Sequence, residues 1–265
     1  MSNVFKVAAI PLDINWGNKA RNLNAVEKIL GKLPFGLDLV VLPETFTTAY
    51  IQDPTLLEEI AETNSGRTID TIHRWSARYG FAICGSFIAT DGVSNYYNRA
   101  FFIEPSGDEY YYDKRHLFTI SGEGRLYTRG DRESPIIRFR GWNIKLAVCY
   151  DLRFPVWCRK RENEYDILIF PANWAHSRAY AFRHLLIARA IENQAFVIGC
   201  NRSGTDDYGS YPATDSGIFN NWGDSIGQMD ENEILFAEFD YDKFNTDREK
   251  FPAYRDNDDF KLIID

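Results

Sequence analysis

Short apolar runs alternate along this chain with longer segments whose apolar residues recur every three or four positions. Short runs bounded by polar or turn residues are typical of buried strands, and the longer periodic segments are typical of amphipathic helices. The pattern predicts strands near residues 5–10, 38–43, 81–89, 96–103, 144–148, 165–170 and 195–200. It predicts helices over residues 18–33, 54–62, 68–79 and 177–193. Strands that alternate with helices in both halves of a chain favour an α/β fold.

Turns and polar stretches organise the remaining residues. A turn at 104–108 gives the preceding strand a hairpin partner at 109–112. We expect loops over the polar, glycine-containing stretches 117–135 and 201–211, and further strands at 136–139, 213–220, 225–229 and 233–240. The chain has no linker, low-complexity segment or short repeat, so residues 1–265 are expected to form a single domain. Within it, the charged and aromatic residues 241–265 are expected to form a C-terminal arm, and such arms often pack on a partner subunit.

The net charge of the 265-residue chain is −8, and no long basic run is present. Nucleic acids and anionic membranes are therefore poor electrostatic partners. No apolar run approaches the ~18 residues that span a bilayer. The first residues lack the basic and apolar regions of an export signal, so we expect a cytoplasmic protein. The four cysteines lack metal-finger spacing and no glycine-rich phosphate loop occurs, which predicts neither a metal nor another cofactor.

One cysteine stands where a nucleophile would be placed. The predicted strand 144–148 ends at Cys149, and Phe154-Pro155 opens a helix-like stretch shortly after it. A helix start offers free N–H groups and the positive end of a dipole, which would lower the pKa of the thiol and favour the thiolate. The alternative is a small buried core residue, the commoner fate of a free cysteine.

Two further reactive residues also come directly after predicted strands. Glu44 follows the strand 38–43, and Lys114 follows the hairpin strand 109–112. If these strands and the one before Cys149 lie side by side in a sheet, the three side chains converge at one edge. A thiolate there would attack a carbonyl or nitrile carbon, a carboxylate would carry the proton, and a lysine with the backbone N–H of Tyr150 would hold the oxyanion. Taken alone, a glutamate or a lysine directly after a strand is more often an ordinary loop residue.

Three blocks carry a resemblance to a known family: Leu42-Pro43-Glu44, residues 113–118 (Asp-Lys-Arg-His-Leu-Phe) and residues 148–155 (Val-Cys-Tyr-Asp-Leu-Arg-Phe-Pro). They resemble, in order and content, the catalytic blocks of the nitrilase superfamily, the carbon–nitrogen hydrolases. The resemblance extends to about residue 240 and implies an α/β fold built as a four-layer α-β-β-α sandwich, commonly a homodimer or larger homo-oligomer. It implies that Glu44 is the general base, Lys114 the oxyanion stabiliser and Cys149 the nucleophile, while Glu123 orients the lysine and the substrate.

Within the superfamily the chain looks most like the bacterial omega-amidases, on residues 151–157, the block Pro171-Ala172-Asn173-Trp174 and residues 199–202 (Gly-Cys-Asn-Arg). Many members have glutamate in place of Val156, and the omega-amidase branch tolerates this difference. The resemblance implies hydrolysis of the terminal amide of 2-oxoglutaramate or 2-oxosuccinamate through a Cys thioester, with release of ammonia.

Such a small-molecule amide carries a carboxylate, which needs a cation or a cluster of N–H groups in its pocket. The arginines that flank the motifs are Arg115, Arg153, Arg183 and Arg202. For Arg153 we favour a structural ion pair with Asp151 over substrate binding. The candidate walls of the pocket are Phe118, Tyr150 and Trp174, for which the alternative is a place in the core.

Other functions stay open at this level. A nitrile, a carbamoyl amine or a ureido acid would begin with the same thiolate attack, and a catalytically silent binding member is a further alternative. The Gly-x-Ser-x-Gly pattern at 223–227 matches a serine nucleophile elbow, but no histidine follows His184, so we reject a serine hydrolase. A papain-like pair needs a histidine after Cys149, and His176 and His184 qualify by order alone.

Overall fold

The computed structural model describes residues 4–264, whose core contains two β-sheets. The larger sheet has the strand order β13-β14-β1-β2-β3-β4-β5, with the bounds β1 (Val4–Ala9), β2 (Leu39–Val41), β3 (Ala82–Thr90), β4 (Tyr96–Ile103), β5 (Glu109–Asp113), β13 (Gln228–Met229) and β14 (Leu235–Asp240). The smaller has the order β12-β9-β8-β7-β6, with the bounds β6 (Ile137–Phe139), β7 (Trp142–Leu146), β8 (Ile167–Ala172), β9 (Phe196–Asn201) and β12 (Gly217–Phe219). Residues 1–3 and Asp265, which the single-domain prediction and the arm include, lie outside the described residues.

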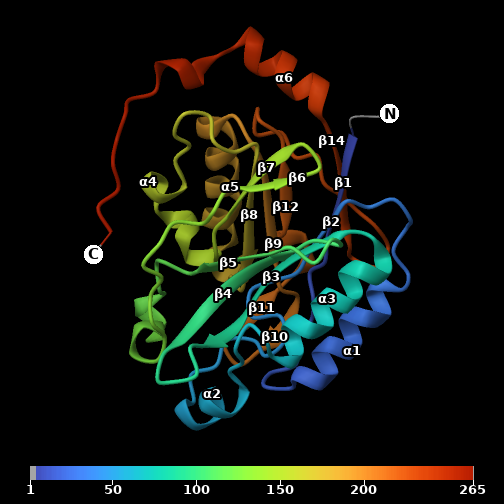
Figure 1. The fold of residues 1–265 in the computed structure, drawn as a ribbon, viewed down its shortest axis with the longest axis vertical. Coiled ribbons are helices and arrows are strands. Elements are labelled where there is room, and N and C mark those ends of the chain that lie inside the picture. Colours follow the sequence, from blue (N-terminus) through green and yellow to red (C-terminus); the bar gives the residue numbers. More distant parts are fainter. Residues whose placement is uncertain (1–3, 265) are drawn as a thin grey trace.

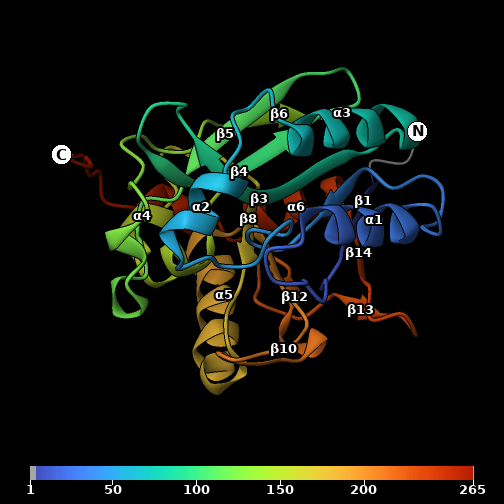
Figure 2. The ribbon, with the colours of Figure 1, turned by 90° about the horizontal axis from the view of Figure 1, so that it is seen from below.

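Helices cover the outer faces of both sheets (Figure 1 and Figure 2). The larger sheet carries α1 (Lys19–Leu30) and α3 (Arg67–Tyr79), and the smaller carries α5 (Ala179–Asn193) on the opposite side of the molecule. Two short helices, α2 (Pro54–Ile60) and α4 (Pro155–Cys158), lie at the margins. The layers confirm the four-layer sandwich. None of the described helices is long and apolar enough to cross a membrane.

The residue alternation in β1 explains why the layers stack. Phe5, Val7 and Ala9 belong to the core between the two sheets, whereas Ala8 faces the second core and shares it with Val26 of α1. Successive side chains of a strand point to opposite faces, so a strand that is apolar at both sets of positions must be covered on both sides. The larger sheet is therefore buried between helices and the second sheet.

The contact between α5 and the smaller sheet depends on a residue without a side chain. A Cβ built on Gly199 of β9 would lie 2.4 Å from a methyl carbon of Leu186 in α5. Glycine therefore allows the helix to approach the strand closely. This contact fixes α5 against the strand that leads into residues 199–202.

The predictions for residues 201–229 were partly wrong. The expected loop contains a hairpin, β10 (Gly204–Asp206) and β11 (Gly209–Tyr211), whose mostly polar side chains hide any apolar alternation. The strand expected at 213–220 begins with the 3₁₀ turn Ala213–Asp215, and only its second half, β12, is extended. Of the strand expected at 225–229 only β13 forms.

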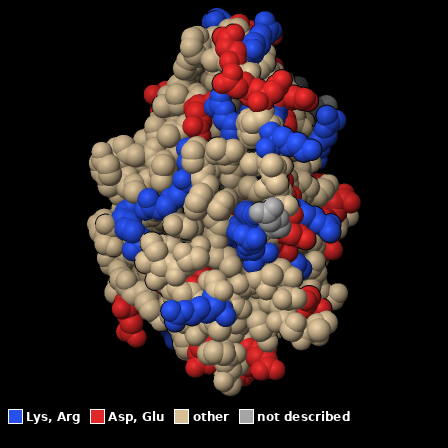
Figure 3. Space-filling model, turned by 90° about the vertical axis from the view of Figure 1, so that its left-hand side faces the viewer, with Lys and Arg blue, Asp and Glu red and all other residues tan. Residues whose placement is uncertain are grey.

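The C-terminal arm is partly helical, which the sequence pattern did not predict. It consists of α6 (Tyr241–Lys250), a 3₁₀ turn (Ala253–Asp256) and an extended tail that runs back along the side of the molecule (Figure 1). Acidic and basic side chains mix at the end of the molecule where α6 lies (Figure 3). Arg248 of α6 donates to the Asp166 carboxylate at 2.8 Å, and both side chains are buried. This buried ion pair attaches the arm to the smaller sheet of its own chain.

Replacing Arg248 by alanine should destabilise the protein by about 3–5 kcal/mol, because the buried Asp166 carboxylate loses its cation. Urea unfolding measures the change. Lys243→Ala is the matched control on the same helix, because Lys243 pairs with Asp247 at the surface and exposed pairs contribute at most about 1 kcal/mol. Equal effects of the two substitutions would contradict the anchoring role of Arg248.

Candidate active site

The three candidate catalytic residues come from both sheets. Glu44 follows β2 and Lys114 follows β5 of the larger sheet, whereas Cys149 follows β7 of the smaller sheet. Their strands do not all lie in one sheet, which was the condition on which the predicted convergence depended, yet the three side chains line one cavity. The residues meet because the two sheets face each other and the ends of these strands reach the same place. A strand end in the sequence does not reveal to which of two facing sheets it belongs.

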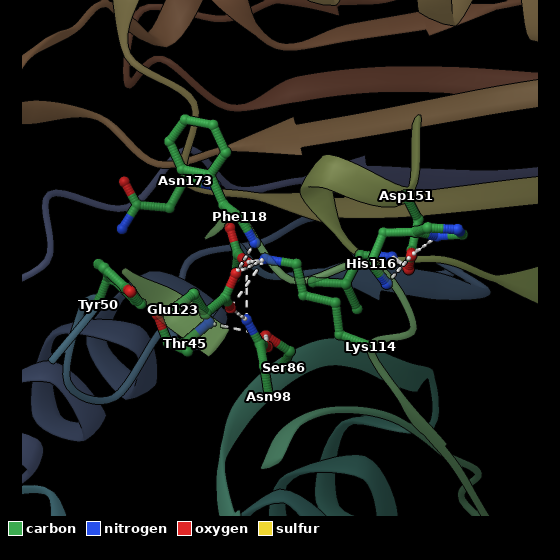
Figure 4. A network of polar contacts seen from close by, with 12 residues as sticks. Thr45, Tyr50, Ser86, Asn98, Lys114, His116, Phe118, Glu123, Asp151 and Asn173 are labelled. Carbon is green, nitrogen blue, oxygen red and sulfur yellow. Dashed lines mark hydrogen bonds and ion pairs between the residues drawn. The ribbon is translucent and has the colours of Figure 1, made fainter. Parts of the chain in front are cut away.

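The side chain of Lys114 is the centre of the polar network in Figure 4. Its ammonium group donates to Glu44 Oε1 at 2.8 Å and to the two Glu123 oxygens at 3.0 and 2.9 Å. The residue is only 2% exposed. Burial disfavours the charge, but Glu123 and Glu44 outweigh it and raise the pKa of Lys114 well above its usual value. The lysine is therefore a buried cation that two carboxylates hold in place.

Glu44 is oriented by groups that sequence reasoning missed. Its Oε1 also accepts from Asn98 Nδ2 at 2.7 Å, and its Oε2 accepts from the backbone N–H of Asn173 at 2.8 Å. The Asn98 oxygen in turn accepts from Ser86 at 2.9 Å. A signal for Asn98 was present, because an asparagine in a strand that is mostly apolar and aromatic needs a partner when it is buried. No signal pointed to the backbone of Asn173.

Glu123 lies in the stretch 117–135, which is largely irregular, as predicted, with two 3₁₀ turns. Besides Lys114, its carboxylate accepts from the backbone N–H of Phe118 and from Asn98 Nδ2, the latter at 3.4 Å. Gly122 precedes it with a φ of 86°, a conformation that glycine adopts without strain. This turn brings the second carboxylate to the lysine.

Cys149 begins a 3₁₀ turn with a φ of 42°, an uncommon value for a residue with a side chain. The expectation that the helix start lowers the pKa of this thiol was wrong. Burial, followed by the negative charge of Glu44, raises the pKa of the Cys149 thiol well above its usual value, and Lys114 opposes this only in part. At neutral pH the sulfur is therefore protonated, and it lines the same cavity as the Glu44 carboxylate.

A cavity of about 200 Å³ opens over these side chains. Glu44, Lys114, Glu123 and Cys149 line it, and so do the three aromatic candidates, Phe118, Tyr150 and Trp174. Tyr50 forms another part of the wall, and burial is the main cause that raises its pKa to about 12. The cavity has the size for a small molecule, with the polar groups gathered at one place and aromatic rings around them.

The arginines are arranged differently from the prediction. Arg153 does not pair with Asp151, whose carboxylate is fully used by other donors; instead its guanidinium lies 4.9 Å from the centre of the Trp174 ring and lines the cavity. Arg178, which the sequence did not indicate, also lines it and lies 5.3 Å from the centre of the Phe118 ring. Arg202 is buried in an ion pair with Asp206.

Arg115 and Arg183 do not line the cavity. Arg115 donates to the backbone oxygen of Gly130, and Arg183 lies over the ring of Phe219. The two remaining arginines, Arg153 and Arg178, form no ion pair with a carboxylate within residues 4–264. Two guanidinium groups in the cavity wall are therefore available to an anionic ligand.

The competing hydrolase patterns find no support. His176 pairs with Asp215 and His184 with the backbone oxygen of Tyr180, so neither histidine is the partner of Cys149. Ser225 lies in a loop just before β13 instead of between a strand and a helix. The described part of the chain therefore offers neither a papain-like pair nor a serine nucleophile elbow at these positions.

The α-β-β-α sandwich and the cysteine–glutamate–lysine group at the strand ends are together typical of hydrolases of carbon–nitrogen bonds. The carbon–nitrogen hydrolase family model matches residues 6–248, so the chain belongs to this family and is an enzyme that hydrolyses carbon–nitrogen bonds other than peptide bonds. This confirms the family that the three sequence blocks indicated.

Similar proteins of known name match over nearly their whole length. A Yersinia enterocolitica protein named omega-amidase YafV is 36% identical over 98% of this chain and 100% of its own. A Bacillus subtilis 2-oxoglutaramate amidase is 30% identical over 94% and 96%. A carbon–nitrogen hydrolase superfamily structure from Xanthomonas campestris, with an arsenic adduct in its active site, is 34% identical with a TM-score of 0.90, covering 98% of this chain and 99% of its own. Saccharomyces cerevisiae Nit3, at 21% identity, a TM-score of 0.81 and 94% coverage of both chains, shows the shared fold.

The Glu44→Gln variant should shift the alkylation of Cys149 to lower pH. The Glu44 charge helps to raise the pKa of the thiol, so its removal lowers that pKa while Lys114 continues to favour the thiolate. Iodoacetamide labelling across a pH series, read by peptide mass spectrometry, gives the midpoint. The exposed Glu109→Gln is the control. A midpoint that stays in place or rises would show that Glu44 does not set the state of the thiol.

Proposed function

We propose that the enzyme is an omega-amidase that hydrolyses the terminal amide of a 2-oxo dicarboxylic acid monoamide, such as 2-oxoglutaramate or 2-oxosuccinamate. Cys149 is the nucleophile, Glu44 the proton carrier, Lys114 the oxyanion stabiliser and Glu123 the group that orients the lysine. The observation that carries this substrate class is the pair of guanidinium groups without carboxylate partners in the same cavity as the thiol. The similarity to the two named amidases supports the same class.

The first step joins the sulfur to the amide carbon. Because the resting thiol is protonated, Glu44 accepts its proton as the C–S bond forms, and the carbonyl becomes an oxyanion. The Lys114 ammonium group and the backbone N–H of Tyr150 stabilise that negative charge. A buried, fixed cation is effective here, since it need not reorganise as the charge develops.

The second step breaks the C–N bond. Glu44 returns the proton to the leaving nitrogen, so ammonia departs and a thioester remains on Cys149. Water then attacks the thioester with Glu44 as the base, through a second oxyanion. The C–S bond breaks, the sulfur recovers a proton and the free acid is released. Glu123 keeps the lysine in place throughout through its two contacts with Nζ.

In this proposal Arg153 and Arg178 hold the carboxylate at the far end of the substrate. Guanidinium groups bind carboxylates through charge-assisted hydrogen bonds in a fixed geometry. Phe118 and Trp174 lie against the two guanidinium groups, and Tyr150 forms the adjoining wall. The aromatic rings keep the arginines directed along the cavity wall while they leave the N–H groups for the ligand.

Ammonia release tests the proposal, with 2-oxoglutaramate measured beside glutamine, a simple aliphatic amide and an aliphatic nitrile. We expect a strong preference for the oxo-amide and no turnover by Cys149→Ala. Preference for another compound of the panel, or for a carbamoyl amine or a ureido acid assayed in the same way, would keep the family chemistry and refute the substrate class. Undiminished turnover by Cys149→Ala would refute the nucleophile.

A second arm of this assay concerns the carboxylate. Arg178→Gln should raise KM for the oxo-amide by roughly tenfold or more, because a charge-assisted hydrogen bond is lost. It should leave the slow reaction of the simple amide unchanged. Arg183→Gln, which alters an arginine outside the cavity, is the matched control. Equal losses on both amides would contradict a role of Arg178 in binding the carboxylate.

We also infer that the enzyme works as a homodimer, or a larger homo-oligomer, through the exposed side of α5. Large apolar side chains lie there, Tyr180 78% and Ile191 51% exposed. Trp222 extends this patch, because Gly223, the next residue, lies against Ile191. The centre of the Trp222 ring lies 5.8 Å from that of Phe251. A contiguous exposed apolar patch is a frequent sign of a protein–protein contact.

Ile191→Asp should convert the assembly into monomers, because a charge in an apolar contact loses its hydration without gaining a partner. Light scattering after size exclusion reports the mass. The control is Phe35→Asp, which alters a fully exposed aromatic residue in the loop between α1 and β2. A monomeric parent protein, or an oligomeric Ile191→Asp variant, would refute this interface.

We further propose that the enzyme works in the cytoplasm. Its four cysteines are all free thiols and all are buried. A reducing compartment maintains such thiols. The proposed mechanism requires this, because an oxidised Cys149 cannot attack the substrate.

A further inference from the structure

The carboxylate of Asp151 makes four hydrogen bonds and is completely buried. Its Oδ1 accepts from the backbone N–H of His116 at 2.9 Å and from His116 Nδ1 at 2.8 Å. Its Oδ2 accepts from the Tyr112 hydroxyl at 2.8 Å and from the backbone N–H of Val148 at 2.9 Å. An ionised carboxylate only accepts, so His116 Nδ1 carries a hydrogen. None of these groups is needed for the bond-making steps described above.

Oδ2 of this carboxylate fixes the turn that contains Cys149. Val148 donates to the Asp151 side chain, and the Asp151 backbone N–H donates back to the Val148 oxygen at 2.9 Å. The two bonds close a ring around Cys149, whose φ of 42° is unfavourable for a residue with a side chain. A strained backbone persists only where its surroundings fix it. Asp151 supplies that fixation at the cysteine.

Oδ1 of the same carboxylate fixes the loop that contains Lys114. His116 comes two residues after Lys114, and Figure 4 shows the His116–Asp151 contact close to the Lys114 side chain. The His116 ring stacks on Phe154 with 3.7 Å between ring centres and 9° between planes. The ring is thus held between a carboxylate and an aromatic face that both follow Cys149 in the chain.

We propose that His116 and Asp151 are positioning residues that fix the distance between the Cys149 sulfur and the Lys114 ammonium group. The Cys149 turn follows a strand of the smaller sheet, and the Lys114 loop follows a strand of the larger sheet. The Asp151 carboxylate is bonded to both segments, so a shift of either sheet end is resisted at the site. The inference rests on the proposed roles of Cys149 and Lys114.

The pair acts on the transition state more than on substrate binding. The oxyanion forms between the sulfur and the lysine, so a change in their separation lowers kcat, whereas the arginine end of the cavity is unaffected. Misplacement of reacting groups by about 1 Å can cost on the order of 100-fold in rate. A purely structural contact would instead lower stability and leave the kcat of the folded enzyme unchanged.

Two substitutions of His116 separate the hydrogen bond from the stacking. His116→Phe retains a ring against Phe154 but removes the donor to Asp151. His116→Asn retains an N–H donor on the atom bonded to Cγ but removes the ring. We expect His116→Phe to lower kcat by roughly 10- to 100-fold with KM within about twofold, and His116→Asn to retain kcat within a few-fold. His73→Phe removes an exposed histidine–glutamate contact and serves as control, with kcat unchanged.

The rate constant for alkylation of Cys149 by iodoacetamide gives a second measurement that needs no substrate. It should change in His116→Phe and not in His116→Asn or His73→Phe, with thermal melting confirming that each variant is folded. Equal kcat in wild type and folded His116→Phe, or equal losses in His116→Phe and His116→Asn, would overturn the positioning role. A wild-type Cys149 that does not react, in an enzyme whose turnover survives Cys149→Ala, would instead overturn the proposed nucleophile and this inference with it.

Discussion

The buried ammonium ion of Lys114 is the charge on which the rest of the site depends. An unpaired ion in a protein interior costs several kcal/mol, so the lysine requires Glu44 and Glu123. These two carboxylates would repel each other without it, so the requirement is mutual. Asn98 bridges both carboxylates, and the backbone N–H groups of Asn173 and Phe118 occupy further oxygens. The cluster is stable only as a whole, because removal of any member leaves a buried charge or donor without its partner.

This dependence extends to the packing of the two sheets. Glu44 and Lys114 are held by strands of the larger sheet, whereas Cys149 and the backbone of Asn173 follow strands of the smaller one. The apolar core between the sheets therefore fixes distances among polar groups that are far apart in the sequence. A cavity made in that core would act on stability and on catalytic geometry together, since a close-packed interior transmits small shifts. At the edge of this core, the Asp151 carboxylate links Val148, before Cys149, to His116, after Lys114, through hydrogen bonds.

Sequence reasoning placed the candidate residues Glu44, Lys114 and Cys149 directly after predicted strands, a pattern that needs only local information, and the structure brings the three side chains together. The alternation of strands and helices indicated only an α/β fold, and the four layers were expected from the resemblance to the family. Sequence reasoning failed where the answer depended on a partner far along the chain. The expected Arg153–Asp151 pair joined near neighbours in sequence, yet Asp151 is used by His116 and Tyr112 from another sheet. No local sequence pattern indicated that Arg178 lines the cavity. Hairpin β10–β11 has mostly polar side chains and resembles a loop by composition.

Because the pKa of Cys149 is raised, the proposed mechanism requires a neighbouring group to remove the proton from the thiol. A thiol that is protonated at rest is protected from oxidation, which proceeds through the thiolate. It also needs a base nearby at the moment of attack, and Glu44 lines the same cavity as the thiol. In the proposed cycle the proton that Glu44 takes from sulfur is the one that ammonia needs to leave. The same burial that raises the thiol pKa excludes water around Lys114, where a low dielectric strengthens its interaction with an oxyanion. In the proposed mechanism, one desolvated site therefore keeps the thiol protonated without substrate and stabilises the negative charge that forms once substrate is bound.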